Sequence, residues 1–197
     1  FMRALVVVNP AATTTTPGTR DVMLGALASE LKVDVAQTEH RGHGRELGIR
    51  AATDGLDLVV VLGGDGTVNE VVDGLLHDGT GPHLPTLAVV PGGSTNVFSR
   101  ALGRSRDPVE ATAEILASLR AGRSRRVSLG TISASGTSTA PLEDPRAGVA
   151  AERAAHDAAE DPGWTRPRWF VFTAGFGFDA DVIARVEAQR ARGGRST

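Results

Sequence analysis

The sequence predicts an α/β fold, in which a parallel-sheet, Rossmann-like nucleotide-binding domain is followed by the start of a second, mainly β domain. Two observations support this prediction. Strand-length apolar runs alternate along the chain with stretches of helical spacing, and the runs are apolar throughout instead of switching between apolar and polar residues. Such runs are typical of parallel strands that helices cover on both faces of a sheet.

A change in composition sets the predicted domain boundary. We place the nucleotide-binding domain at residues 2–127 and a partial second domain at residues 128–197. Residues 134–167 are rich in Ala, Gly, Ser, Pro and charged residues and have no apolar period, so we expect a flexible insertion there. A strand, a glycine turn and a helix are expected to follow at 168–187.

The elements of the first domain can be assigned in chain order. Runs of β-branched and aliphatic residues predict strands at 4–9, 33–38, 57–62 and 86–91. Helical spacing and start or stop signals predict helices at 22–31, at 40–55, from Thr67 onwards and from Asp107 to Gly122, with a loop at 11–18. Thr67 and Glu70 form the T-x-x-E pattern of a capping box. Asp107 followed by Pro108 is typical of a helix start.

Four polar loops follow the predicted strands. Because the carboxyl ends of parallel strands meet at one edge of an open sheet, and ligands bind there, we expect these loops to form one site. The loops are Asn9-Pro10, Thr38, Gly63 to Thr67, and Gly92 to Asn96.

The third loop has the residues of a phosphate cradle. Gly63, Gly64 and Gly66 allow backbone amides to approach a ligand without an intervening Cβ, beside a helix start that favours anions. Asp65 lies among these glycines, and a desolvated carboxylate without a partner costs several kcal/mol. We therefore expect Asp65 to meet a magnesium-bound phosphate, a substrate hydroxyl or a nest of backbone amides. The alternative is a tight turn in which Thr67 only caps the helix.

These segments resemble the diacylglycerol kinase catalytic-domain family, which includes bacterial lipid kinases and sphingosine and ceramide kinases. NAD kinases and phosphofructokinases are more distantly similar. The resemblance covers nearly the whole chain in order and spacing. It rests on GGDGTVNE (63–70), the Asn-Pro pair after the first strand, Thr38, PGGSTN (91–96) and AGFGFDADV (174–182).

The resemblance implies a two-domain enzyme that binds ATP, with Mg²⁺, in the cleft between its domains. It implies that Asp65 is catalytic, beside the γ-phosphate and the acceptor hydroxyl. The implied nucleotide-binding residues are Asn9, Pro10, Thr38, Gly63, Gly64, Asp65, Gly66, Thr67, Val68, Asn69, Glu70, Gly93, Ser94, Thr95 and Asn96. We predict no set of protein side chains dedicated to a metal.

The chain departs from the family pattern in several places. Ser94-Thr95 replaces the usual Thr-Gly or Thr-Ala, and Val97 replaces a frequent Asp. Thr13 and Thr14 occupy the place of a serine-glycine pair. The family has a late Asp-Gly-Glu-like motif that is thought to supply the catalytic base, and none follows residue 187. We therefore expect the sequence to be a fragment or to lack segments.

Three functions are compatible with these residues. The first is an ATP-dependent lipid kinase that transfers the γ-phosphate of ATP to the hydroxyl of a diacylglycerol-like lipid. The second is an NAD kinase or another small-molecule kinase of the same fold. The third is a nucleotide-binding domain without turnover, which the incomplete second domain favours.

Composition narrows the partners and the location. The net charge of −2 gives no general attraction to nucleic acid, and the absence of cysteine excludes disulfides and thiolate metal sites. No apolar run approaches the ~20 residues of a membrane helix, so we expect a cytoplasmic protein that associates peripherally with the inner face of the membrane to meet its lipid substrate. Arginines outnumber acids from Arg100 to Arg126, which fits either an anionic lipid surface or a solvated face. Homodimerisation is left open.

Overall fold

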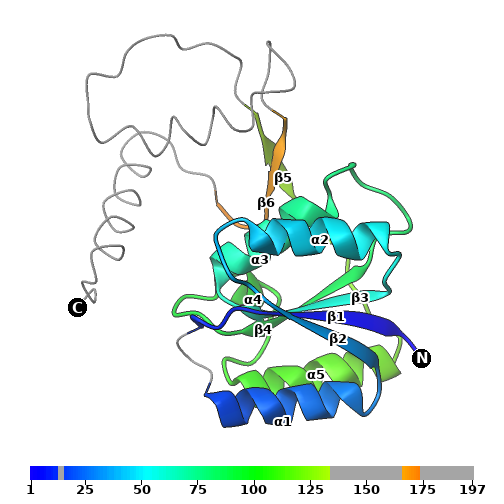
Figure 1. The fold of residues 1–197 in the computed structure, drawn as a ribbon, viewed down its shortest axis with the longest axis vertical. Helices are drawn as coiled ribbons and strands as arrows, with labels where there is room; N and C mark the ends of the chain where they lie inside the picture. Colours follow the sequence, from blue (N-terminus) through cyan, green and yellow to red (C-terminus); the bar gives the residue numbers. More distant parts are fainter. Residues whose placement is uncertain (13–15, 134–165, 174–197) are drawn as a thin grey trace, which may run out of the picture.

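A four-stranded parallel sheet forms the centre of the computed structural model, which describes residues 1–12, 16–133 and 166–173. Its strands are β1 (Arg3–Val8), β2 (Lys32–Gln37), β3 (Leu58–Gly63) and β4 (Thr86–Pro91). They lie in the order β2-β1-β3-β4, all parallel (Figure 1). The predicted parallel α/β fold is confirmed.

Helices cover both faces of this sheet (Figure 1). The helices are α1 (Pro17–Ala28), α2 (His43–Thr53), α3 (Asp65–Leu75), α4 (Val97–Ala101) and α5 (Pro108–Arg120). Alternate residues of each strand point to opposite faces. Val6 and Val8 therefore pack in one core with α1 and α5, whereas Leu5 and Val7 pack in another with α2 and α3.

The edge strand β2 differs from the prediction that every strand is apolar and buried. Asp34, Val35 and Gln37 are not buried, because β2 pairs only with β1 and the helices lie mainly over the central strands. The central strand β3 is buried along its whole length. Its carboxyl end therefore provides a rigid support for the glycine loop that follows.

Helix α1 begins earlier than predicted, at Pro17 instead of residue 22. The Thr16 side chain accepts a hydrogen bond from the backbone nitrogen of Thr19, and Pro17 occupies the first turn. The predicted loop at 11–18 is thus two residues too long at its carboxyl end. Helix α5 agrees with its prediction, since the Asp107 carboxylate caps its first turn.

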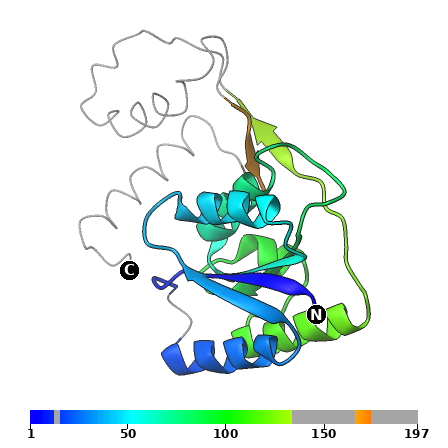
Figure 2. The same ribbon diagram turned by 45° about the vertical axis from the view of Figure 1, so that its right-hand side comes forward.

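A second, two-stranded antiparallel sheet pairs β5 (Gly130–Ile132) with β6 (Arg168–Phe170). It lies beside α3 (Figure 2). The strand expected at residue 168 is confirmed, whereas almost all of the predicted insertion and the glycine turn and helix expected before residue 187 lie outside the described residues. The domain boundary after residue 127 stays a prediction.

A buried carboxylate joins the second sheet to α3. The Asp73 side chain is 3% exposed and accepts hydrogen bonds from the Arg45 Nε at 3.1 Å, from the Arg168 Nε, and from the Trp169 backbone nitrogen at 2.8 Å. One turn earlier on α3, the Asn69 Oδ1 accepts a hydrogen bond from the Val171 backbone nitrogen at 3.2 Å. One face of α3 therefore binds the segment that contains β6. Nothing in the sequence pattern around Asp73 predicted this role.

Helices α2 and α3 approach so closely that glycines lie at their contact, Gly48 on α2 and Gly74 on α3. A Cβ at Gly74 would overlap the backbone carbonyl of Arg45. We expect Gly74→Ala to lower the free energy of unfolding by about 1–3 kcal/mol, the range found for overpacked interiors. Urea denaturation followed by circular dichroism measures this change.

Helix α1 offers a matched control for this substitution. Gly25 lies inside α1, and no neighbouring atom lies within 4 Å of the position that a Cβ would take there. Gly25→Ala should raise the free energy of unfolding by about 0.5–1 kcal/mol, because alanine restricts the unfolded chain and favours a helix. Equal effects of the two substitutions would mean that the α2–α3 contact is not close.

Candidate active site

The two glycine loops at the carboxyl edge of the sheet pack backbone against backbone. The backbone nitrogen of Gly92 donates a hydrogen bond to the Gly63 carbonyl at 3.0 Å. A Cβ at Gly93 would lie 2.7 Å from the Cα of Gly64, which is closer than side chains allow. The glycine at 93 is thus required by the close approach of the loops after β3 and β4.

Asn96 shapes the second loop. Its Oδ1 accepts a hydrogen bond from the Gly93 backbone nitrogen at 2.9 Å, and its Nδ2 donates to the Gly93 carbonyl. Asn96 adopts the left-handed conformation with φ of +48°, which asparagine tolerates better than most residues. Ser94 and Thr95 are left exposed at the tip of this loop.

Asn9 connects the loop after β1 to α3. Its Nδ2 donates a hydrogen bond to the Thr67 Oγ1 at 2.9 Å, and its Oδ1 accepts one from the Ala11 backbone nitrogen at 2.9 Å. Thr67 is therefore not a capping residue, and α3 begins two residues earlier, with Gly64 at its N-cap position. The Asn-Pro pair, which alone would be an ordinary turn, fixes the first turn of α3.

The predicted capping box is wrong for Glu70 as well. The Glu70 carboxylate accepts hydrogen bonds from the backbone nitrogens of Gly42 at 3.0 Å and Gly44 at 3.1 Å, at the start of α2. A carboxylate is favoured at this position by the unpaired amides of a helix start. Glu70 thus holds the start of α2 against α3, and a local sequence pattern could not show so distant a partner.

A cavity of about 420 Å³ opens among these loops. Its walls combine the loops after β1 and β2 with the first turns of α3. The lining residues are Asn9, Pro10, Ala11, Thr38, Glu39, His40, Arg41, Gly66, Thr67 and Glu70. Six predicted nucleotide-binding residues, from three segments of the chain, therefore meet in one cavity, and its size is within the usual range for small-molecule sites.

The remaining predicted residues lie outside this cavity lining. Gly63, Gly64, Asp65, Gly93, Ser94, Thr95 and Asn96 belong to the paired glycine loops beside it. Val68 is buried in the core on the α2 and α3 face, so its side chain packs there. Asn69 bonds to the backbone of Val171, as described above.

Sequence reasoning missed three cavity residues that follow Thr38, namely Glu39, His40 and Arg41. The rings of His40 and His43 stack with centroids 4.8 Å apart, and His40 is exposed. The His43 Nδ1 also accepts a hydrogen bond from the Glu39 backbone nitrogen at 3.1 Å. The position of Glu39, His40 and Arg41 directly after the second strand was the signal that could have identified them as site residues.

Asp65 meets one of the three partners that we expected, a nest of backbone amides. Its Oδ2 accepts a hydrogen bond from the Val97 nitrogen at 3.0 Å, and its Oδ1 accepts one from the Phe98 nitrogen at 3.2 Å. The carboxylate thus caps α4, while the residue as a whole stays partly exposed. Asp65 is fixed at the carboxyl edge of the sheet and remains accessible to a ligand.

Among the described residues, the amides in the first turn of α3 have no hydrogen-bond partner and lie beside Asp65. The first hydrogen bond of this helix is donated by the Val68 nitrogen to the Gly64 carbonyl, at 3.1 Å. The amides of Asp65, Gly66 and Thr67 therefore precede the helical ladder, as the first amides of any helix do. Together with the helix dipole, such amides favour an anion.

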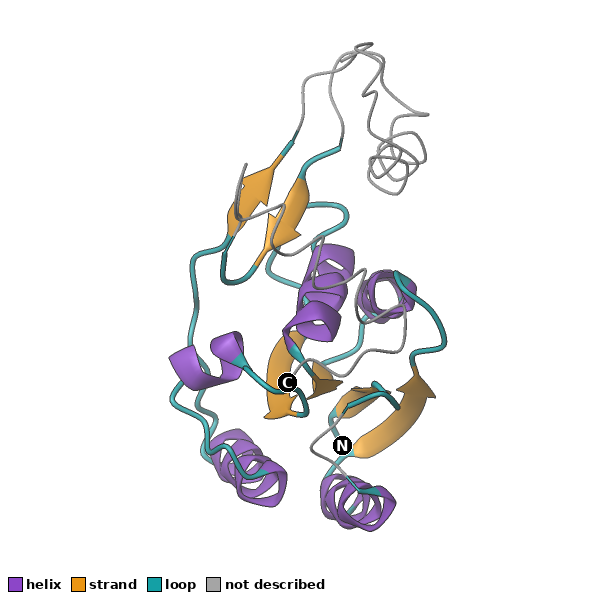
Figure 3. Cartoon of the chain, turned by 90° about the vertical axis from the view of Figure 1, so that its left-hand side faces the viewer, coloured by secondary structure: helices purple, strands orange, loops and turns teal. Residues whose placement is uncertain are grey.

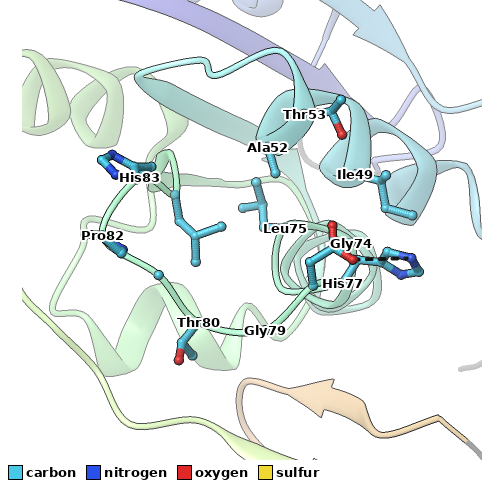
Figure 4. Close-up of a pocket in the computed structure, with 13 residues that line it drawn as sticks. Ile49, Ala52, Thr53, Gly74, Leu75, His77, Gly79, Thr80, Pro82 and His83 are labelled. Atoms are coloured by element: carbon cyan, nitrogen blue, oxygen red, sulfur yellow. Dashed lines mark ion pairs between the residues drawn. The ribbon is translucent and has the colours of Figure 1, made fainter.

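A smaller cavity of about 260 Å³ lies at the other end of α2 and α3 (Figure 4). Ile49, Leu75 and His77 contribute to its wall. Burial lowers the pKa of His77 below its usual value, and the guanidinium groups of Arg166 and Arg45 lower it further. None of the predicted site residues lines this cavity.

The described residues hold neither a cluster of metal ligands nor a membrane-spanning helix. No group of three or more His, Cys, Asp or Glu side chains could hold a metal ion in that part of the chain. No helix within residues 1–12, 16–133 and 166–173 is both long and apolar enough to cross a bilayer.

Known proteins are similar to this chain in sequence. A curated diacylglycerol kinase of Bacillus subtilis is 49% identical over 59 residues, which are 30% of this chain and 18% of that protein. A Stenotrophomonas maltophilia protein named "Probable lipid kinase YegS-like" is 34% identical over 116 residues, which are 51% of this chain and 38% of that protein. The chain thus spans less than half the length of these relatives.

Solved structures agree with the sequence relatives. A crystal structure of a diacylglycerol kinase from Bacillus anthracis superposes with a TM-score of 0.54 at 29% identity, over 69% of this chain and 46% of that one. A family model described as "Diacylglycerol kinase catalytic domain" matches residues 3–132, which is well over half of the chain. The resemblance inferred from the motifs is confirmed, and the chain belongs to the diacylglycerol kinase catalytic domain family.

Proposed function

We propose that this chain is the nucleotide-binding part of an ATP-dependent lipid kinase, which transfers the γ-phosphate of ATP to the hydroxyl of a diacylglycerol-like lipid. The observation that most directly supports this proposal is the cavity at the carboxyl edge of the sheet. Asn9, Thr38 and Thr67 line this cavity beside the first amides of α3. The names of the relatives and the family match support a lipid acceptor.

In this proposal the chain contributes positioning and electrostatics, which dominate phosphoryl transfer. The amides of Gly66 and Thr67 bind phosphate oxygens, and the Thr38 hydroxyl contacts the nucleotide. Asp65 orients the acceptor hydroxyl in line with the phosphate, or orients the metal ion, and forms no covalent bond itself. The α4 amides that bind Asp65 keep its carboxylate in place.

The residues also fit a magnesium ion that arrives with the nucleotide. Mg²⁺ is usually held by one or two carboxylates together with substrate phosphates, instead of a cage of protein side chains. Asp65 is a carboxylate in the glycine loop at the carboxyl edge of the sheet, and it is partly exposed. When bound, the ion would neutralise charge that develops on the phosphates.

Labelled ATP tests the proposed reaction. The full-length protein is incubated with labelled ATP and Mg²⁺, and separately with diacylglycerol vesicles, with NAD or with no acceptor. We expect label in the lipid fraction only. Label in NAD would support the small-molecule kinase instead, and binding of ATP without any transfer would support a domain without turnover.

A glycine pair tests the nucleotide site. Gly66 and Gly18 are both the second residue of a helix, and neither has an atom within 4 Å of the Cβ position. Only Gly66 lines the cavity. Gly66→Val should raise the KM for ATP about tenfold, which corresponds to ~1.4 kcal/mol of lost binding. Gly18→Val should leave KM unchanged, and equal KM values for both variants would place the nucleotide elsewhere.

A further inference from the structure

An arginine-rich surface adjoins the loop of Asp65. Residues 94–106 and 115–133 contain no Asp or Glu, although the whole chain has a net charge of −2. The same two stretches contain seven arginines: Arg100, Arg104, Arg106, Arg120, Arg123, Arg125 and Arg126. Positive charge is thus concentrated in one part of a slightly acidic chain.

Two of these arginines are neutralised within the fold. Arg104 pairs with Glu114 at 3.5 Å, and Arg120 pairs with Glu30. Within the described part of the chain, Arg100, Arg125 and Arg126 form no ion pair with a carboxylate and are exposed. Their charges are therefore available to a partner.

Arg100, Arg125 and Arg126 come from two segments that lie together. Residues 121–128 are exposed and connect α5 to the second sheet, passing beside α4 (Figure 3). The Arg125 Nη2 donates a hydrogen bond to the Ala101 carbonyl at the end of α4, at 3.5 Å. Arg100 belongs to the same last turn of α4. The connection and α4 therefore form one continuous surface.

Exposed apolar side chains accompany these charges. Val97 is 36% exposed and Val127 is 42% exposed. Val97 is also the residue whose backbone nitrogen binds the Asp65 carboxylate. The surface thus begins at the proposed catalytic carboxylate. Arginines mixed with exposed apolar side chains are typical of proteins that bind the interface of an anionic bilayer.

We propose that Val97, Arg100, Arg125, Arg126 and Val127 form a docking face for a bilayer that contains anionic phospholipids. The face would bring the headgroup region, and with it the lipid hydroxyl, to the edge of the sheet where Asp65 lies. The idea that this contact delivers a substrate depends on the proposed lipid kinase function. Binding of the protein to the bilayer can be measured whether or not the protein is a kinase.

Vesicle sedimentation tests the docking face. The full-length protein is mixed with vesicles of about 30% phosphatidylglycerol in phosphatidylcholine, or of phosphatidylcholine alone. We expect binding to the anionic vesicles that weakens as salt is raised. Each basic residue near such a surface contributes about fivefold in binding, so Arg125→Glu with Arg126→Glu should reduce it at least about 20-fold.

A charge-matched double variant is the control. Arg20→Glu with Arg50→Glu makes the same change in net charge on α1 and α2, away from the face, and should bind anionic vesicles like the wild type. The milder pair Arg125→Gln and Arg126→Gln keeps the test informative if charge reversal prevents folding. An equal loss in the control, or equal binding to neutral vesicles, would overturn the docking face.

Activity assays separate this proposal from the kinase proposal. On a short-chain, water-dispersed diacylglycerol the Arg125 and Arg126 variants should turn over like the wild type, whereas on vesicles they should be slower. Binding to vesicles without lipid phosphorylation would sink the kinase and leave the docking face standing. If the same variants lose binding to RNA while no vesicle is bound by the wild type, the face serves a nucleic acid and the proposal is wrong.

Discussion

Asp65→Asn in the full-length protein is expected to lower the kcat of lipid phosphorylation by about 10²–10³-fold, the usual effect of removing one positioned acid–base or electrostatic group. Asparagine has nearly the same shape but carries no negative charge with which to orient the hydroxyl or the metal ion. Its oxygen can still accept one of the two hydrogen bonds that α4 donates. Turnover of labelled ATP into lipid, at saturating ATP, measures the effect.

Asp107 provides the matched control, because it also caps a helix. Its carboxylate accepts hydrogen bonds from Val109 and Glu110 at the start of α5, outside the cavity. Asp65→Asn and Asp107→Asn should each lower the free energy of unfolding by up to about 1 kcal/mol, as expected for a weakened cap. Only Asp65→Asn should lower kcat. Near-normal turnover by that variant would make Asp65 a structural cap.

Asp73→Ala should lower the free energy of unfolding by about 3–5 kcal/mol, because the loss of one partner leaves buried charges uncompensated. We expect the lower end of this range. The Arg45 side chain is 28% exposed and the Arg168 side chain is 44% exposed, so both guanidinium groups can turn partly to water. Urea denaturation gives the value, and hydrogen exchange at Trp169 shows whether β6 has separated from α3.

The control for this second substitution is Asp78→Ala, a little further along the chain. Asp78 is 91% exposed and pairs with Arg166 at 3.5 Å on the surface. Surface pairs contribute between about 0 and 1 kcal/mol, so this variant should be nearly as stable as the wild type. If Asp73→Ala costs no more than Asp78→Ala, Asp73 does not hold the second sheet.

The central part of the fold could be predicted from the sequence because its signals are local. The run from Leu58 to Leu62 is aliphatic throughout, which suits a strand that is buried on both faces. The edge strand was harder to characterise, since Lys32 and Asp34 show exposure only once the strand order is known. The start of α1 was missed because the cap at Thr16 precedes the apolar stripe on which the prediction relied.

The candidate site could be predicted in position but not in its internal contacts. The rule that strand ends meet at one edge brought Asn9, Thr38 and Thr67 together correctly. The rule says nothing about which side chain bonds to which backbone group. Glu70 bonds to amides 26 and 28 residues away, and Asp73 bonds to the backbone 96 residues away. Such partners depend on how whole elements pack, so a local motif is compatible with several of them.

One helix carries both the phosphate-side loop and the attachment of the second sheet. Asn69 and Asp73 clamp the segment around β6 at two points one turn apart, and Asp65 begins the same helix. Because hydrogen bonds at two positions fix the orientation of the β6 segment on α3, this segment cannot rotate freely about the helix. Any rotation of β6 relative to the first sheet must therefore either tip α3, and with it the glycine loop, or break these hydrogen bonds. A change in the tilt of the second sheet would then reach Asp65 through a single helix.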